Sequence, residues 1–581
     1  MDILRADMGD AEFWASIDWR SAENDVKRLR QRIYRAARNG DLKQVRNLQR
    51  LMLRSRANTL TSVKRVAQKS TGRKTAGIDG EVALTPEKRG QLAKQILADP
   101  SIPAKPVRRV NIPKAKGKTR PLGIPVLRDR ADQARVKNAL EPEWEARFES
   151  GSYGFRPGRS AHDAVTLLYK AVPPRASAKR LYAVDADLSK AFDRISHQHI
   201  MDSIGLFPAR RQILGWLRAG VIEQGTYSST REGTPQGGVI SPLLLNVALH
   251  GMEKVIGANR PHGEWKHADT TLARYADDFV ILTVSAEKAE WCVRQLTDWF
   301  EPRGVSFNED KTRIAHLTEG IDFLGFNIRR HGHRTVIQPS KEALSRARKR
   351  IKETIRKHRG SSPELLVTAL SPYTRGWAAY YRSANSGKAF SQLDAYTYQE
   401  LRTWARRRHP SKPDGWIAKR YWGPFNKEKP RYRWVFGSPE KCLRLFAWTT
   451  IEYHRIVRGD ASKDDAELAE YWAKRARKRI AGLQSLESKR IWWLAVRQKG
   501  LCPRCGTDLI EGAGYDPDEV SDWAKWFTAS LRGINAHHLQ YRSNGGGDHP
   551  TNLEVIHTQC HQQLHAGDRR RHRDTSGRRP A

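Results

Sequence analysis

The chain has 581 residues, with 104 Lys and Arg against 63 Asp and Glu, so its formal net charge is +41. This length predicts three to five domains, and its five Cys exclude a disulfide-stabilised scaffold and indicate a reducing compartment. No apolar run reaches the roughly 20 residues that cross a bilayer, so we expect a cytoplasmic protein with no membrane partner. Nucleic acid is the expected counterpart of so much positive charge; the alternative is a basic surface that only water and salt cover.

The first part of the chain has a helical pattern from Ser21 to about Ser70. Apolar residues recur there at spacings of three and four, and Asn39-Gly40-Asp41 supplies a stop and a new N-cap, so we expect a helical hairpin. A loop is expected from Gly72 to about Gly80. From Val107 to Ile328 short β-like runs alternate with helical stretches, which indicates an α/β or α+β core. The β-like runs are Leu181–Val184, Phe279–Val284, Val305–Phe307 and Phe323–Ile328.

The second half of the chain is basic and aromatic. A strongly basic helix is predicted from Ser340 to Lys357, and the stretch from Trp377 to Trp416 is rich in aromatic residues and arginine. A further basic helical stretch runs from about Ala466 to Arg497. Cys and His residues gather between Leu501 and about His565, and a basic tail around Arg569–Arg571 is expected to be disordered.

Two groups of acids point to phosphoryl-transfer chemistry. Asp185 and Asp187 lie two apart on a β-like run, so both side chains project from one face, while Asp277-Asp278 stands between apolar flanks. Carboxylates are rarely left unpaired in a core. Acids converging from two strands in a basic chain suit a two-metal site, because Mg²⁺ prefers oxygen ligands. For Asp277-Asp278 alone, the alternative is a turn-forming pair at a hairpin tip.

A second metal-binding pattern lies near the C-terminus. Cys502-Pro503-Arg504-Cys505 and His557-Thr558-Gln559-Cys560 are two knuckles, each with two residues between its ligands. They predict a structural Zn²⁺ held by four side chains, Cys502, Cys505, His557 and Cys560. Cys292 and Cys442 have no such company and are expected to be buried as apolar residues.

From about residue 20 to residue 565 the chain resembles the reverse transcriptases encoded by bacterial group II introns. Tyr275-Ala276-Asp277-Asp278 is similar to the polymerase box of that family, and the stretch from Asp185 to Asp193 is similar to its first metal-binding strand. The resemblance implies a multidomain α+β fold, with the fingers and palm of a right-hand polymerase. It implies that Asp185 is structural and that two Mg²⁺ are held by three catalytic acids, Asp187, Asp277 and Asp278.

The resemblance also implies a binding site for deoxynucleoside triphosphates. Phe192 would press on the sugar and exclude a 2′-hydroxyl, basic fingers residues would hold the triphosphate, and Gln236 would lie beside the template–nucleotide pair. Lys311 would help to neutralise the departing pyrophosphate. The implied substrate-binding residues are Arg108, Lys114, Phe192, Gln236, Tyr275 and Lys311. A solvated β-hairpin remains the alternative for Arg108 and Lys114, and a surface salt bridge for Lys311.

Two later stretches, Arg375–Arg382 and Leu401–Pro410, resemble the maturase segment that acts as the polymerase thumb and binds the intron RNA. Their composition suits structured RNA, because Arg binds phosphate while Trp and Tyr stack on unpaired bases. The alternative for the aromatic residues is the core of a helical bundle, which leaves the arginines as contact candidates. These are Arg375, Arg382, Arg406 and Arg407.

The histidines around the second knuckle look like an HNH nuclease domain of the ββα-metal type. By this resemblance His538 is the general base, because histidine is suited to proton transfer near neutral pH, and Asn552 pins the loop and orients that base. The implied ligands of a single divalent ion, expected to be Mg²⁺, are His537, His561 and His565. A zinc module without nuclease activity remains an alternative, and His557 could belong to the catalytic metal instead of zinc.

The resemblance divides the chain into six segments. They are a helical N-terminal extension (1–70), fingers and palm (71–338), a helical maturase or thumb domain (339–435), a basic DNA-binding region (436–495), an HNH endonuclease (496–568) and a basic disordered tail (569–581). The implied function joins RNA-directed DNA polymerase, maturase and DNA endonuclease activities in the bacterial cytoplasm and at the nucleoid. The implied partners are the intron RNA, target double-stranded DNA and deoxynucleoside triphosphates. The alternatives are a splicing-only RNA-binding maturase and a domesticated reverse transcriptase.

Overall fold

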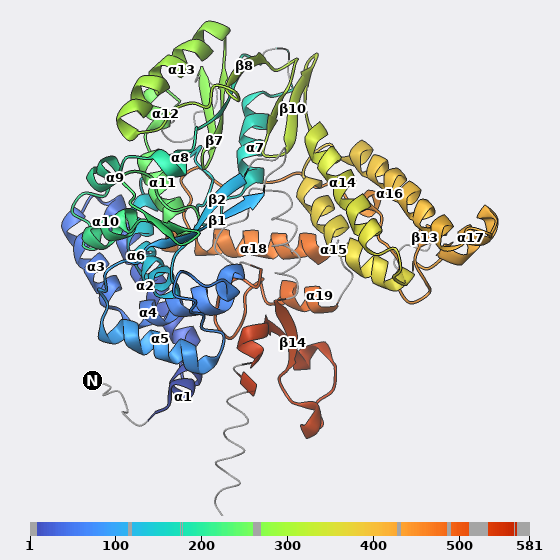
Figure 1. Cartoon of the computed structure of the whole chain (residues 1–581), viewed down its shortest axis with the longest axis horizontal. Helices are drawn as coiled ribbons and strands as arrows, with labels where there is room; N and C mark the ends of the chain where they lie inside the picture. Colours follow the sequence, from blue (N-terminus) through green and yellow to red (C-terminus); the bar gives the residue numbers. More distant parts are fainter. Residues whose placement is uncertain are drawn as a thin grey trace, which may run out of the picture.

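The computed structural model describes residues 8–113, 119–174, 176, 178–258, 269–426, 431–484, 490–510, 533–562 and 564–565. Figure 1 shows three regions in this part of the chain: a large body, an arm of helices (residues 341–421) and a smaller C-terminal module (residues 490–565). The predictions for Lys114 and for the tail (569–581) lie outside the described residues.

The N-terminal extension is helical, as its apolar spacing predicts. α2 (Trp19–Arg38) and α3 (Leu42–Arg54) form the expected hairpin. The Asp41 side chain accepts a hydrogen bond at 2.9 Å from the backbone N–H three residues on, which makes it the predicted N-cap. The helical chain continues through α4 (Arg56–Lys64) and a π-helical turn, η1 (Arg65–Lys69).

An outer sheet follows, with the strand order β2-β1-β4-β5. β1 (Val107–Pro113) pairs antiparallel with β2 (Thr119–Ile124) and parallel with β4 (Val221–Glu223), which turns back into β5 (Thr226–Ser228). α6 (Leu127–Glu145) comes directly after β2 and is buried along most of its length against α2, α3 and α4. The N-terminal extension and the body are therefore packed together.

The central sheet has the order β6-β7-β3-β8, and all its neighbours are antiparallel. Its strands are β6 (Thr270–Tyr275), β7 (Asp278–Thr283), β3 (Tyr182–Asp187) and β8 (Arg313–His316). Side chains alternate between its two faces, as the period of two in a strand requires. Ala183 and Val280 belong to one buried core and Val184 and Phe279 to another, so both faces are covered.

Helices on each face hold the central sheet in place. α7 (Ala161–Ala171) contributes to the first core, while α9 (His197–Ile204), α11 (Ser241–Ala248) and α13 (Ala286–Phe300) contribute to the second. The α+β class expected of this part of the chain is confirmed.

The predicted β-like runs have mixed outcomes. Leu181–Val184 and Phe279–Val284 correspond to β3 and β7. The prediction of a strand at Val305–Phe307 is wrong, because only Phe307 forms an isolated bridge there and the apolar side chains pack into the core instead. The run Phe323–Ile328 is two strands, because positive φ angles at Leu324 and Gly325 turn the chain between them.

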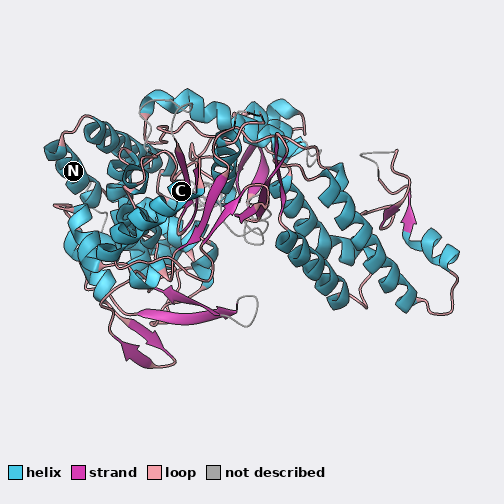
Figure 2. Ribbon diagram, turned by 90° about the horizontal axis from the view of Figure 1, so that it is seen from above, coloured by secondary structure: helices cyan, strands magenta, loops and turns pink. Residues whose placement is uncertain are grey.

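A three-stranded sheet and the helical arm come next. β9 (Ile321–Phe323), β10 (Phe326–His331) and β11 (Arg334–Pro339) lead into α14 (Lys341–Lys357). The predicted basic helix is therefore confirmed, and the Ser340 side chain caps it by accepting the backbone N–H of Ala343 at 3.1 Å. Figure 2 shows the helices of the arm standing out from the body.

The rest of the arm is α15 (Pro363–Tyr381), α16 (Gly387–Arg408) and α17 (Asp414–Tyr421). Its aromatic residues lie inside the bundle, between 0% and 4% exposed: Trp377, Tyr380, Tyr381 and Trp404. The core alternative therefore holds for all four of them.

The C-terminal module contains an antiparallel hairpin of β14 (Ile534–His538) and β15 (Leu553–His557). It follows α18 (Ala469–Gln484) and α19 (Arg490–Arg497), so the predicted basic helical stretch is confirmed within the described residues. Gln498 fastens the end of α19 to β15, since its side chain both donates to and accepts from the backbone of Val555, at 2.9 and 2.6 Å.

Residues 452–465, which we call the strap, return from the arm to the body. The Asp464 carboxylate accepts two hydrogen bonds from Arg30, at 2.8 and 2.7 Å, and Arg30 also pairs with Glu141 at 2.9 Å. Arg159 donates to the backbone carbonyls of Gly459 and Ala461, at 2.6 and 3.2 Å. These buried contacts join the strap to α2, α6 and the segment before α7.

Replacing Asp163 with Asn is expected to destabilise the body by about 3 kcal/mol at neutral pH, because a buried charge network loses one partner. Burial alone would raise the pKa of Asp163, but the His454 imidazole, Arg475 and the backbone N–H of Val457 hold it well below its ordinary range. An Asp whose pKa is lower in the folded state than in the unfolded state stabilises the fold above about pH 4. That stabilisation is lost as the pH falls through the folded-state pKa.

Thermal unfolding of the wild type and the Asp163→Asn variant at pH 7 and at progressively lower pH measures this effect. The difference in unfolding free energy should shrink below about pH 4. Asp460→Asn is the matched control, because Asp460 lies on the strap and is exposed. An equal loss from both substitutions would contradict the assignment.

Among the described residues, no helix combines the length and the apolar character needed to cross a membrane.

The remaining elements are α1 (Asp10–Ala15), η2 (Thr71–Lys74), α5 (Pro86–Ala98), α8 (Ala191–Arg194), α10 (Arg210–Arg218), α12 (Met252–Val255), η4 (Glu301–Arg303), β12 (Trp422–Gly423), β13 (Val435–Phe436), η5 (Phe446–Trp448), η6 (Ala466–Leu468), η7 (Arg542–Asn544) and η8 (Pro550–Asn552).

Candidate active sites and metal centre

The strand register gathers three acids at one end of the central sheet. Asp187 on β3 stands directly opposite Asp278 on β7. Residues opposed in this way point to the same face, with Cβ atoms about 4.5–5.5 Å apart. Asp277 lies in the two-residue turn that joins Tyr275 to Asp278. The structure therefore brings Asp187, Asp277 and Asp278 together.

Lys311 faces all three acids. Its ammonium forms an ion pair with Asp187, and the Asn308 amide donates to the same carboxylate at 3.4 Å. Burial alone would lower the pKa of Lys311, but the hydrogen bond to Asp187 and the charges of the other two acids raise it. A cluster of carboxylates needs positive charge nearby, and divalent cations bound by oxygen meet that need.

Asp185 has a different partner from the three acids. Its carboxylate pairs with Arg313 at 3.3 Å, although burial still raises the pKa of Asp185 above its ordinary value. It lies on the same strand face as Asp187. The register of β3 and β7 puts it opposite Val280, two residues from the paired acids.

Three aromatic rings line the neighbourhood of the acids. Phe192, 4% exposed, lies edge-on to Phe155 with ring centroids 6.3 Å apart, and Phe155 lies 6.5 Å from Tyr275. Phe155 has a φ of +60°, a left-handed conformation that is uncommon for a bulky residue. The residue pattern predicts no role for Phe155, since a backbone conformation leaves no signal in it.

The loop that holds Gln236 is locked to the outer sheet. The backbone N–H of Gly123 donates to the Gln236 carbonyl at 2.6 Å. A Cβ on Gly237 (φ +115°) would lie 2.6 Å from the Gly123 carbonyl oxygen, so only glycine fits. Arg108, on the adjoining strand β1, has a buried Nε that finds no hydrogen-bond partner among the described residues. Val107 and Gly123 meet the Gln236 loop on one face of the outer sheet, and Arg108 projects from the opposite face. Lys114 lies outside the described residues.

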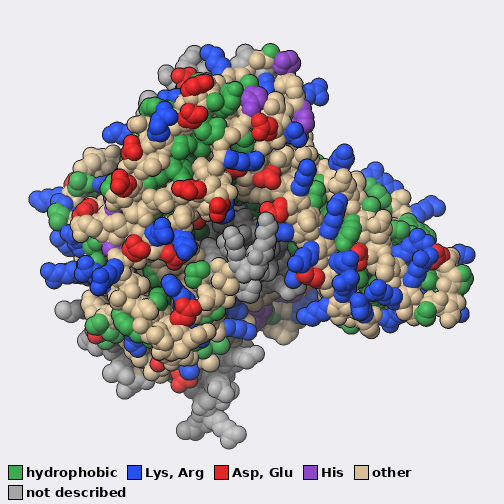
Figure 3. Space-filling model, turned by 45° about the horizontal axis from the view of Figure 1, so that its top comes forward, with side chains coloured by type: hydrophobic (Ala, Val, Ile, Leu, Met, Phe, Trp, Pro, Cys, Tyr) green, Lys and Arg blue, Asp and Glu red, His purple; other side chains and the backbone are tan. Residues whose placement is uncertain are grey.

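The four arginines predicted to contact RNA have different surroundings. Arg406 and Arg407 are exposed at the end of α16, and Arg406 shares Asp414 with Arg402. Arg375 is half-buried, and Arg382 is half-buried and paired with Glu452 at the start of the strap. Figure 3 shows Lys and Arg side chains gathered over the arm.

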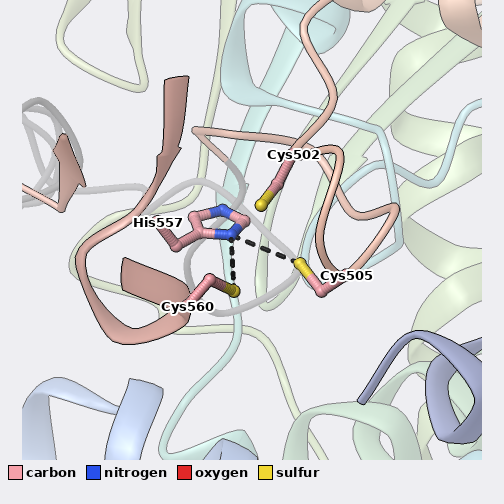
Figure 4. A group of neighbouring side chains, drawn as sticks. All are labelled: Cys502, Cys505, His557 and Cys560. Atoms are coloured by element: carbon pink, nitrogen blue, oxygen red, sulfur yellow. Dashed lines mark hydrogen bonds between the residues drawn. The ribbon is translucent and has the colours of Figure 1, made fainter. Parts of the chain in front are cut away.

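Both knuckles converge on one point in the C-terminal module, as Figure 4 shows. The ligand atoms of Cys502, Cys505, His557 and Cys560 all lie within 4.8 Å of one another. His557 Nδ1 is 3.4 Å from the Cys505 sulfur and 3.9 Å from the Cys560 sulfur. Hydrogen bonds from the neighbouring thiols lower the pKa of Cys505, which favours a thiolate. Three free, buried thiols and an imidazole fit a tetrahedral zinc site.

This cluster of Cys and His residues lies against the N-terminal extension. The Gln559 side chain donates to the Gln68 carbonyl in η1 at 2.9 Å. Lys64 and Lys69 lie nearby and share Glu23, at 3.6 and 3.4 Å. The N-terminal helices and the Cys and His cluster near the C-terminus are therefore in contact.

A second histidine group lies beside the hairpin. The ligand atoms of His537, His561 and His565 lie within 4.8 Å of one another, and the Nε2 atoms of His561 and His565 are 3.2 Å apart. His557 is absent from this group and belongs to the knuckle cluster. Three converging imidazoles can hold one divalent ion.

His538, at the end of β14, bonds to Asp548 through Nε2 at 2.7 Å. Hydrogen bonds from Arg542 and His538 lower the pKa of Asp548 to about 2, so this carboxylate stays ionised. A carboxylate in this position fixes the ring of a histidine base. In the sequence Asp548 follows three glycines, Gly545 to Gly547, and this pattern does not indicate a partner of His538.

Asn552 holds the loop between His538 and Asp548. Its amide nitrogen donates to the carbonyls of Gln540 and Gly547, at 3.0 and 2.8 Å, and its oxygen accepts the backbone N–H of Gln540 at 2.8 Å. All three hydrogen-bonding partners are backbone groups of one loop. Asn552 thus has the geometry of a loop-pinning residue.

Four family models match the chain. "Reverse transcriptase (RNA-dependent DNA polymerase)" matches residues 112–328, and "N-terminal domain of reverse transcriptase" matches residues 14–96. "Group II intron, maturase-specific domain" matches residues 344–422, and "HNH endonuclease" matches residues 526–567.

Two similar proteins match about half and about three fifths of this chain. The chain is 34% identical over 322 residues to Protein YkfC of Escherichia coli (strain K12), a match covering 48% of this chain and 83% of that protein. It is 27% identical over 459 residues to the group II intron-encoded protein LtrA of Lactococcus lactis subsp. cremoris, covering 61% and 74%. Apo telomerase from Candida Tropicalis is 15% identical with a TM-score of 0.31, and the match covers 41% of this chain and only 55% of that one.

Proposed function

This chain belongs to the family of group II intron-encoded reverse transcriptases, and from that membership we propose which residues serve each of its activities. It is a multifunctional protein with reverse transcriptase, maturase and HNH endonuclease domains, so the predicted family and both enzyme activities are confirmed. We place it in the bacterial cytoplasm and at the nucleoid, where a reducing environment keeps its thiols free.

In the proposed cycle the protein binds its intron RNA, and the ribonucleoprotein inserts that RNA into one strand of double-stranded target DNA. The HNH domain nicks the other strand. The 3′-hydroxyl released there primes DNA synthesis on the intron RNA. The exposed Arg406 and Arg407 and the positive surface of the arm support the RNA contact.

DNA synthesis is assigned to the end of the central sheet. The observation that carries this assignment is the pairing of Asp187 with Asp278, one residue from Asp277. These acids would hold two Mg²⁺, which when bound activate the attacking hydroxyl and stabilise the leaving oxygen. Lys311 would pass from Asp187 to the departing pyrophosphate, since its ammonium already faces the three acids.

The incoming deoxynucleoside triphosphate is assigned to the space between the central and outer sheets, the proposed palm and fingers. Arg108 and Lys114 would hold its phosphates, and the unsatisfied Nε of Arg108 supports an anionic partner. Phe192 and Tyr275 would face the sugar, with Phe155 behind them. Gln236 would lie beside the template–nucleotide pair.

Nicking is assigned to the hairpin of the C-terminal module. His538 would take the proton from the attacking water, with its ring fixed by Asp548 and its loop held by Asn552. A divalent ion, proposed to be Mg²⁺, would be held by His537, His561 and His565, and when bound it stabilises charge on the phosphate. Zn²⁺ in the knuckle cluster would serve the fold alone.

Replacing His538 with Ala is expected to lower second-strand nicking by about 100-fold or more while leaving primer extension unchanged, because general-base catalysis contributes that much. Nicking of a labelled duplex by the assembled ribonucleoprotein measures the first activity and cDNA synthesis the second. His549→Ala is the matched control, since His549 is an exposed histidine of the same loop that bonds to Thr551. Full nicking by His538→Ala would overturn the assignment of the base.

A further inference from the structure

Arg274 is a charged side chain buried directly beside the turn that carries Asp277. It is 1% exposed. Its guanidinium donates to the Ala276 carbonyl at 3.1 Å, to the Asn246 side-chain oxygen at 3.0 Å and to the Ser152 hydroxyl at 2.7 Å. One planar group therefore links the turn to two separate segments of the body.

The backbone around Arg274 is fixed as well. Its N–H donates to the Gly151 carbonyl at 2.8 Å, and its carbonyl accepts the N–H of Tyr153 at 2.9 Å. The Asn246 amide donates to the Gly154 carbonyl at 2.8 Å. A Cβ on Gly154 would lie 2.3 Å from the Ala276 nitrogen, so only glycine allows this approach. The segment 151–154 thus lies directly against the turn.

The turn itself needs such support. Ala276 has a φ of +62°, a left-handed conformation that residues other than glycine rarely adopt. Strained backbone of this kind persists where the surroundings hold it, and it is concentrated at active sites. The carbonyl that Arg274 binds belongs to the peptide group between Ala276 and Asp277. Holding that carbonyl fixes the plane from which the Asp277 side chain projects.

Burying a guanidinium beside neutral oxygens is a costly way to fill space. Burial lowers the pKa of Arg274 to about 10, although Glu149 and Glu253 act against this. A well-packed apolar side chain would meet a purely structural need at lower cost. The position of the charge suggests a use at the polymerase site.

We propose that Arg274 is a positioning residue of the polymerase: its hydrogen bond to the Ala276 carbonyl sets the peptide plane that aims Asp277 at the metal pair. The inference rests on the proposed role of Asp277 as a metal ligand. Partners that orient metal ligands typically change metal affinity or activity by about 10–100-fold when they are lost.

The test is the Mg²⁺ dependence of primer extension by the full chain carrying Arg274→Lys. Lysine keeps the charge but lacks the planar fork that reaches three acceptors. The Mg²⁺ concentration for half-maximal extension is expected to rise about tenfold. Cooperative thermal unfolding of the same chain shows that the variant is folded.

Arg156→Lys is the matched control. Arg156 is a buried arginine of the same scaffold, 2% exposed, and it pairs with Glu145 at 2.9 Å. Its hydrogen bonds run to Glu145 and to the carbonyls of Glu149 and Ser152, whereas Arg274 donates directly to the Ala276 carbonyl of the turn. Its loss is expected to lower the unfolding temperature and leave the Mg²⁺ dependence unchanged.

Ser152→Ala covers the case in which Arg274→Lys does not fold, because it removes one acceptor of Arg274 and no charge. It is expected to shift the Mg²⁺ requirement in the same direction by about twofold. A folded Arg274→Lys, or Ser152→Ala, with the wild-type Mg²⁺ requirement would overturn the inference. An equal shift in Arg156→Lys would overturn it as well.

Asp277→Asn separates this inference from the proposed function. Full extension by Asp277→Asn would mean that the proposed metal site is wrong. An inactive Asp277→Asn beside an Arg274→Lys with unchanged Mg²⁺ dependence would leave the site in place and refute only the role of Arg274.

Discussion

Replacing Asp187 with Asn is expected to lower Mg²⁺-dependent cDNA synthesis by on the order of 1,000-fold, which corresponds to about 4 kcal/mol of transition-state stabilisation. Asp187 stands opposite Asp278 and is the acid that Lys311 and Asn308 already contact. An amide cannot supply the negative charge that a shared metal pair requires. The measurement is primer extension on an RNA template at saturating Mg²⁺.

Asp185→Asn is the matched control for this experiment. Asp185 lies two residues earlier on the same strand face, but its carboxylate pairs with Arg313. Its replacement is expected to leave most of the extension rate intact. Equal losses in both variants would contradict the assignment of Asp187, and an absence of cDNA from the wild type would favour the splicing-only alternative.

Replacing Cys505 with Ser is expected to abolish zinc binding and nicking together while leaving cDNA synthesis in place. The described sheet of the C-terminal module has only two strands, and an isolated hairpin is marginally stable in water. A structural zinc site supplies about 10–16 kcal/mol of apparent binding energy in small domains, so its loss removes the main source of stability.

Zinc content, limited proteolysis and nicking of the purified protein measure this effect. Cys442→Ser is the control, because Cys442 is half-buried and lies outside the knuckle cluster. A Cys505→Ser variant that retains one zinc per chain and nicks DNA would rule out the knuckle as the zinc site.

Local patterns predicted much of this structure. Two features depend only on a few neighbouring residues each: the Asn39-Gly40-Asp41 break between α2 and α3, and the cap of α14 at Ser340. Apolar runs predicted strands less reliably, because an apolar run indicates that side chains are buried and does not show that the backbone pairs with another strand. Val305–Phe307 is apolar for its place in the core, and Phe323–Ile328 conceals a turn.

Long-range contacts explain what sequence reasoning missed. Arg274 lies within β6, and only its contacts with the Ser152 segment and with Ala276 show that its guanidinium is buried beside the turn. In the sequence Asp548 belongs to a glycine-rich loop, and only the folded hairpin places it beside His538. Spacing along the chain carries no signal for such partners.

The strap limits how the polymerase can be separated from the segments that follow it. A chain that ends after the arm, before residue 452, leaves Asp163 without its His454 partner and Arg30 without Asp464. Unpaired charges at such depth are costly. Arg475 also pairs with Asp163, at 3.8 Å. A minimal polymerase made by trimming this protein, or a hybrid that exchanges its nuclease for another, should therefore be joined beyond residue 475.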